Sequence, residues 1–153
     1  MEEQGSSEAP AVRGVEHWAV LAAAALAFVG LLAMRWILTP DPHGYGTHEQ
    51  LGLPPCRAID WFGVPCPGCG VTTSVTWFAH ASPWRSFVVQ PLGFLLGSVA
   101  LAGLPAALVA SWLGRDLGYE LRRLRLMRWW IGVTFVVAAA WIYKIVAVLA
   151  RGA

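Results

Sequence analysis

The residues of this chain whose types and spacing could do chemistry are its three cysteines. Cys66 and Cys69 lie in the stretch "VPCPGCGVTT", residues 64–73, and Cys56 lies ten residues before the pair. Pro-Gly between two cysteines forms a tight turn. A helix that starts directly after the turn would place its N-terminus beside the thiols and favour the thiolate. Redox, metal-binding and structural roles are all open at this point.

Thiol–disulfide exchange is the first of these roles. Cys66 and Cys69 are then the catalytic candidates, and Cys56 could act as a resolving thiol. Three cysteines allow at most one disulfide within the chain. Catalytic C-x-x-C pairs usually lie in a βαβ thioredoxin-like domain, and the sequence has no such pattern.

A structural zinc ion is the second role, because a C-x-x-C knuckle is the usual half of a zinc site. The second knuckle is missing. The candidate ligands are Cys56, Cys66, Cys69 and His48, with His43 in place of His48 as an alternative. His80 is a poor ligand, since on a continuous helix it lies about 16 Å along the axis from Cys69. Zinc is the only cofactor that the sequence suggests, and otherwise none is expected.

The third role is structural, a constrained turn in or at the membrane. Its residues are Pro65, Cys66, Pro67, Gly68, Cys69, Gly70 and Thr72. Glycine permits unusual backbone angles, and the hydroxyl groups that follow could satisfy backbone carbonyls or bind a neighbouring helix. Irregular backbone at membrane depth is tolerated only where protein buries it or water reaches it.

The composition indicates an integral membrane protein. Of the 153 residues, 57% are hydrophobic and 13% are charged, against roughly 25% charged in soluble domains. The mean hydropathy is +0.56. A net charge of +2, without interleaved basic and aromatic residues, gives no support for nucleic-acid binding.

The apolar runs predict an all-α membrane protein with three transmembrane helices, at about 18–38, 84–113 and 129–150, because a helix needs roughly 20 apolar residues to cross a bilayer. A short re-entrant or interfacial helix is expected at 70–80, after the turn. We expect one membrane domain over 18–150, between a polar tail (1–17) and a short C-terminal tail (151–153). Pro91 and Pro105 are expected to kink the second span.

Arginine is concentrated in one loop. Residues 114–128 hold five arginines, whereas the longer 39–83 loop holds only Arg57. Positive loops face the cytoplasm, which predicts an internal N-terminus and places the CPGCG turn and the C-terminus outside. Arg122, Arg123 and Arg125 are candidate contacts for anionic lipid head groups.

The cysteine region resembles the domain of unknown function 2752 family of bacterial membrane proteins. The resemblance rests on Cys56, on "CPGCGVT" at 66–72 and on "QPLGFLLG" at 90–97. It implies a small bacterial inner-membrane protein and brings no established reaction. The family commonly has arginine where this chain has Thr73, Asn-Pro where it has Gln90-Pro91, and Gly-Asp where it has Ala81-Ser82.

These observations favour a non-enzymatic accessory or scaffold protein with a structural Cys-Pro-Gly-Cys turn. Its expected partners are the lipid bilayer and either another membrane protein or a second copy of the chain. The alternatives are a membrane redox protein using Cys66 and Cys69, and a metal-binding membrane protein using cysteine and histidine ligands.

Overall fold

The computed structural model describes residues 13–123 and 126–152, and these residues form helices without any strand. The helices are α1 (Val15–Ile37), the 3-10 helix η1 (Thr47–Leu51), α2 (Arg57–Phe62), α3 (Val71–Ala79), α4 (Pro83–Val89), α5 (Pro91–Trp112), α6 (Leu117–Arg123) and α7 (Leu126–Gly152). Three of them, α1, α5 and the 130–150 part of α7, are long and apolar enough to cross a membrane. The predicted fold class is confirmed, including the short helix after the turn.

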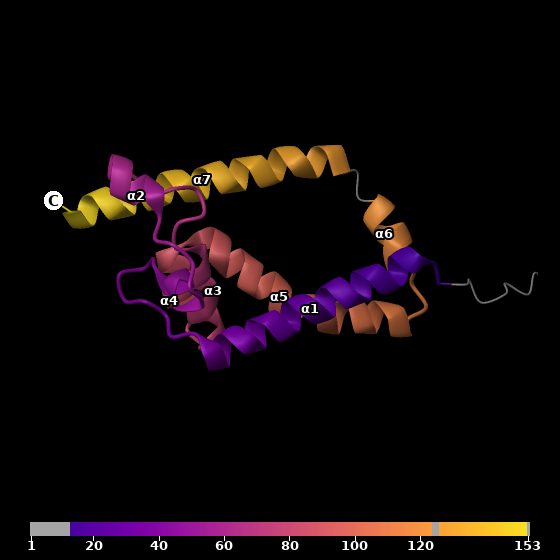
Figure 1. Ribbon diagram of the computed structural model, residues 1–153. Coiled ribbons are helices and arrows are strands. Elements are labelled where there is room, and N and C mark those ends of the chain that lie inside the picture. Colours follow the sequence, from indigo (N-terminus) through magenta and orange to yellow (C-terminus); the bar gives the residue numbers. More distant parts are fainter. Residues whose placement is uncertain (1–12, 124–125, 153) are drawn as a thin grey trace, which may run out of the picture.

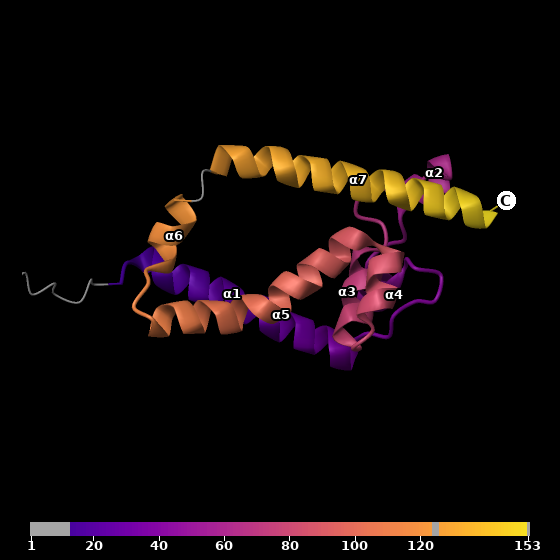
Figure 2. The same ribbon diagram turned by 180° about the vertical axis from the view of Figure 1, so that it is seen from behind.

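The three long helices place the short elements in two groups at opposite ends of the molecule (Figures 1 and 2). At one end, the start of α1 meets the end of α5 and the start of α6. His17, fully buried, accepts a hydrogen bond at Nδ1 from the Leu117 backbone (3.2 Å), and its Nε2 lies 3.3 Å from Ser111 Oγ. At the other end, α3 packs against α1, α4 and α5, and α4 also packs against α5. The C-terminal half of α7 reaches the same region. The chain therefore crosses from one end to the other three times.

The stretch predicted as one span over 84–113 consists of two helices. The break is at Gln90, which is extended (φ −162°, ψ 109°) and directly precedes Pro91. Proline pushes the residue before it out of the helical region and has no N–H to donate. Pro91 thus begins a new helix and does not kink an old one. Pro105 does lie inside α5, which bends along its length in Figure 2.

Helix α3 lies directly against α5 because α5 has glycine at the contact. A Cβ atom on Gly93 would lie 2.5 Å from Ser74 Cβ, and one on Gly97 would lie 2.7 Å from the Phe78 ring. Ser74 and Phe78 are one helical turn apart, as are the two glycines. The GxxxG spacing of α5 is therefore the surface that receives the short helix.

Polar side chains are buried in this structure and large apolar ones are exposed, which is the pattern expected of helices surrounded by lipid. The largest fully buried side chains are nearly all polar, and they include Lys144, His17, Gln90, Thr47 and Thr73. Large apolar side chains such as Leu26, Trp112 and Phe135 are exposed. Lipid replaces water around such helices, so apolar side chains can face outward while polar groups find partners inside.

Helix ends differ slightly from the expected bounds. Helix α1 begins at Val15 and α7 at Leu126, a few residues before the predicted spans.

Residues 1–12, 124, 125 and 153 lie outside the described residues, so the tails and Arg125 are not placed. Arg122 and Arg123 belong to α6, at the end of the molecule opposite the turn. The division into one membrane domain and two tails stays a prediction.

Candidate functional site

The CPGCG sequence forms a tight turn that becomes the start of α3. The Cys69 N–H donates to the Cys66 carbonyl (3.0 Å), and the Val71 N–H donates to the Gly68 carbonyl (3.1 Å). Gly70 is the N-cap of α3 and has φ +83°, which suits glycine. Its carbonyl accepts the first helical bond, from the Ser74 N–H at 2.8 Å.

Gly70 also lies where three segments converge. A Cβ atom at this position would lie 2.5 Å from the Gly44 carbonyl oxygen and 2.8 Å from Lys144 Nζ. Gly44 belongs to the loop after α1, and Lys144 belongs to α7. The residue is therefore constrained both by its backbone angle and by space.

Helix α7 attaches to this region through side-chain donors. Trp141 Nε1 donates to the carbonyl of Pro65 at 2.9 Å, in the segment leading into the turn. Lys144, only 2% exposed, donates from Nζ to the carbonyls of Gly44 (2.9 Å) and Val89 (3.2 Å). The turn is therefore part of the surface on which α7 sits.

The helix break at Gln90 leaves the last carbonyl groups of α4 without partners inside the helix, so that side chains of α7 can bind them. The last carbonyls of a helix have no partner within it, and α4 ends just before Pro91. Tyr143 donates from its hydroxyl to the carbonyl of Val88 (2.6 Å), and Lys144 donates to that of Val89. A lysine ammonium is also favoured near a helix C-terminus, where the helix dipole is negative.

Buried hydroxyl and amide groups complete the site between α3 and the α4–α5 break. Ser74 Oγ lies 2.8 Å from the Ser86 carbonyl, 2.9 Å from Ser86 Oγ and 2.8 Å from the Gln90 carbonyl. The Gln90 amide nitrogen donates to the Pro67 carbonyl at 3.5 Å. Gln90 Oε1 and Thr73 Oγ1, both buried, have no hydrogen-bond partner. The hydrogen bonds tie the turn to both short helices.

The three thiols lie close enough to influence one another, and none is in a disulfide. Burial acts to raise the pKa of Cys56, but hydrogen bonds from the Ile59 and Cys66 N–H groups and from the Cys66 thiol outweigh it and lower the pKa. Burial, then the hydrogen bond with Cys56, raises the pKa of Cys66. Burial, then the neighbouring Cys56 and Cys66, raises the pKa of Cys69 to about 12, although the Lys144 ammonium acts in the opposite direction.

The contacts change the roles expected of the cysteines. Cys56 and Cys66 are within hydrogen-bonding reach of each other. Cys56 has the thiol that is easiest to ionise, whereas Cys69 is 5% exposed and stays protonated at neutral pH. If the site exchanges disulfides, Cys56 is the attacking thiol. The sequence interpretation had given that role to the Cys66–Cys69 pair.

The structure does not bring the proposed zinc ligands into one group. Within residues 13–123 and 126–152, no three side chains of His, Cys, Asp or Glu are placed to hold a metal ion. His48 Nε2 lies 3.2 Å from the Pro54 carbonyl, and His43 pairs with Asp41 at 3.0 Å. Each histidine thus has another partner.

The main site residue that the sequence interpretation missed is Lys144. Lysine inside an apolar span is a functional-site signal in its own right. Lys144 lies near the end of the third apolar run, however, and lysine at such a position more commonly extends to the membrane surface. Ser86 and Gln90 were missed because single hydroxyl and amide residues carry no distinctive spacing. The Ser74 hydroxyl is one of those after the turn that were expected to bind backbone carbonyls, and it lies 2.8 Å from the carbonyls of Ser86 and Gln90. Thr72, expected in the turn, accepts the Thr76 hydroxyl at its carbonyl (2.8 Å), inside α3.

One family model matches the part of the chain that contains this site. Residues 56–112 match the family described as protein of unknown function, DUF2752. The resemblance drawn from the cysteine motif is confirmed. The DUF2752 segment begins at Cys56 and includes the turn, the α3–α4 pair and α5, whereas Lys144 lies outside it. Comparisons with curated proteins and with solved structures found no match.

One departure from the DUF2752 pattern has a structural consequence. Ala81, where the resemblance implies glycine, has φ +56°, the one left-handed angle outside glycine among the described residues. A Cβ atom makes that conformation unfavourable by roughly 1–2 kcal/mol. The turn between α3 and α4 therefore carries backbone strain in this chain.

Proposed function

We propose that the protein is a non-enzymatic accessory or scaffold protein of the bacterial inner membrane, with the CPGCG turn as its structural junction. The observation that supports this most is the attachment of α7: Trp141 and Lys144 donate to carbonyls of the turn region and its neighbours. All these acceptors are backbone atoms. The junction therefore needs the shape of the turn and does not need free thiols.

The arginine-rich α6–α7 connection supports an internal N-terminus, with the turn on the outer side of the membrane. Reporter fusions at the two ends of the chain test this orientation. An active external reporter at the C-terminus and an internal one at the N-terminus are expected. The opposite pair of results would reverse the orientation but leave the junction unaffected.

Serine substitution separates a structural turn from a reactive one. We expect Cys66→Ser with Cys69→Ser to leave protein abundance and melting temperature near those of the native chain, because serine keeps the size and the backbone acceptors are retained. Gly70→Ala is expected to lower both, since its Cβ would meet Gly44 and Lys144. Gly63→Ala is the matched control: Gly63 also has positive φ, but no atom lies within 4 Å of its added Cβ. Equal losses in the two alanine variants would contradict the junction.

A second candidate function is thiol–disulfide exchange by Cys56 and Cys66, which their contact and the lowered pKa of Cys56 support. The Cys56 thiolate would attack one sulfur of a partner's disulfide, and the other sulfur would leave as a thiolate and take up a proton. Cys66 would then lose its proton to the second leaving sulfur and attack Cys56. The partner gains two electrons, and the Cys56–Cys66 disulfide forms.

Alkylation with mass spectrometry of native membranes tests this candidate. A redox role predicts a Cys56–Cys66 disulfide that forms under oxidant and opens under mild reductant, with Cys69 unlabelled in both states. Labelling that changes only with a chelator would favour zinc. Three thiols that never form a bridge under oxidant would refute exchange and leave the structural proposal standing.

A further inference from the structure

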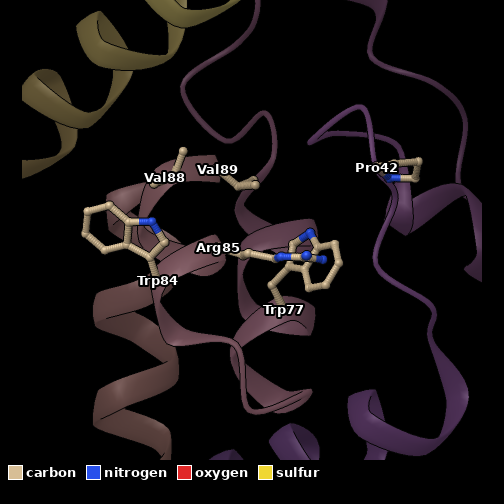
Figure 3. Close-up of a pocket in the computed structure, with 6 residues that line it drawn as sticks. All are labelled: Pro42, Trp77, Trp84, Arg85, Val88 and Val89. Carbon is tan, nitrogen blue, oxygen red and sulfur yellow. The ribbon is translucent and has the colours of Figure 1, made fainter.

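A cavity beside the junction combines one arginine with apolar walls. It has a volume of about 350 Å³ and is lined by Pro42, Trp77, Trp84, Arg85, Val88 and Val89. These residues come from α3, from α4 and from the loop after α1 (Figure 3). None of them carries a candidate function derived from the cysteines.

Arg85 is held in a defined position in this cavity. Its guanidinium lies over the Trp77 ring, 4.7 Å from the ring centroid, and Figure 3 shows the side chain reaching from α4 onto that ring. A cation over an indole face is attracted by the ring and loses part of its freedom. The planar group therefore presents its donors in a fixed orientation before any ligand binds.

Among residues 13–123 and 126–152, the positive charge of Arg85 has no carboxylate within ion-pair distance. Asp41, a carboxylate in the loop that also contributes Pro42 to the cavity, is placed in an ion pair with His43. Lys144 lies behind the cavity wall, but its Nζ is bonded to the carbonyls of Gly44 and Val89. Arg85 is thus the cation available to a negatively charged group in the cavity.

The cavity adjoins the start of an apolar helix long enough to cross a membrane, and the ends of such helices lie near the lipid head groups. Arg85, Val88 and Val89 directly precede Pro91, where the α5 span begins. Trp84 is 73% exposed, and tryptophan collects at the membrane–water interface. Apolar walls below an arginine match a molecule with a negative head and hydrocarbon chains.

We propose that this cavity binds one anionic phospholipid, with its phosphate on Arg85 and its glycerol and first methylene groups against Trp84, Val88 and Pro42. Arginine suits phosphate because its fork of N–H groups can donate two parallel bonds. Net negative charge distinguishes the preferred lipid from a zwitterionic one, whose own ammonium group would face the guanidinium. The site lies at the opposite end of the molecule from Arg122 and Arg123.

The test measures lipid retention by the full-length protein. The protein is reconstituted with equal amounts of phosphatidylglycerol and phosphatidylcholine, released from the bilayer, and its bound lipids are counted by native mass spectrometry. We expect the native protein to retain phosphatidylglycerol preferentially and Arg85→Gln to lose that preference by about tenfold, as for one charged contact. Arg85→Lys is expected to fall between them.

Arg57→Gln is the matched control. Arg57 also stacks on an indole, 5.9 Å from the Trp61 centroid, but does not line the cavity. The Arg57→Gln variant should retain phosphatidylglycerol as the native protein does. Val88→Trp, which fills the cavity and keeps Arg85, should lose retention and covers the case in which Arg85→Gln does not fold.

Equal retention by the native protein and Arg85→Gln would overturn the proposal, as would equal uptake of the two lipids by the native protein. A change of oligomeric state in Arg85→Gln with unchanged lipid retention would also overturn it and would indicate a second copy of the chain in the cavity.

Discussion

Replacing Lys144 by methionine is the perturbation for which the structure gives the clearest magnitude. The variant keeps the length and most of the volume of the side chain but removes the ammonium group. Two carbonyls, of Gly44 and Val89, then lose their donor. Each hydrogen bond from a charged donor contributes about 1.5–3 kcal/mol.

Part of that loss is offset, because methionine avoids the cost of taking an ammonium group out of water. We therefore expect Lys144→Met to lower the free energy of unfolding by about 2–4 kcal/mol. Helix α7 should be affected first, since its other side-chain hydrogen bonds to the rest of the molecule lie close by, at Trp141 and Tyr143.

The assay is reversible unfolding of purified protein, titrated from a mild detergent into SDS and followed by tryptophan fluorescence and circular dichroism. Ile142→Met is the control, because Ile142 is on the same helix and is 61% exposed. It should change stability by less than about 0.5 kcal/mol. The reasoning is refuted if Lys144→Met is as stable as the control.

The remaining predictions concern packing, strain and thiol ionisation. Gly93→Ala should lower the free energy of unfolding by about 1–3 kcal/mol, because the added Cβ would meet α3. Gly103→Ala is the control and should not lower it, since no atom lies within 4 Å of its added Cβ. Equal effects of the two variants in SDS unfolding would contradict the packing of α3 on α5. Ala81→Gly should raise stability by about 1 kcal/mol because glycine adopts φ +56° without strain, and a loss of stability in the same assay would contradict this. As pH rises, Cys56 should be alkylated first, since its pKa is lowered, and Cys69 last, since its pKa is about 12; peptide mass spectrometry across pH 6–9 reads the order, and the reverse order would refute it.

The sequence predicted the elements well and their contacts poorly. The three spans follow from hydropathy, because every lipid-facing position must be apolar for the helix to stay in the bilayer. The turn was visible because cysteine, proline and glycine each have strong local effects. The break at Gln90 was not, since a proline inside an apolar run can either kink a helix or end it.

The partners of the turn depend on tertiary structure that spacing does not reveal. Lys144 reaches a carbonyl 100 residues away in the chain. Near the end of an apolar run, lysine more commonly extends to the membrane surface. The pairing of Cys56 with Cys66 was also hidden, because it depends on how the loop after α1 folds back onto the turn.

The burial of the Lys144 amine tests the central claim most directly, and the chain makes it simple to measure because Lys144 is its only lysine. The native protein is treated with an amine-reactive reagent in mild detergent and in SDS, and labelling of the α7 peptide is followed by mass spectrometry. A junction that holds α7 on the turn predicts labelling at least about 100-fold slower in the native protein, and similar protection after Cys66→Ser with Cys69→Ser. Labelling of the native protein at the SDS rate would show that Lys144 is not held there, and would contradict the account.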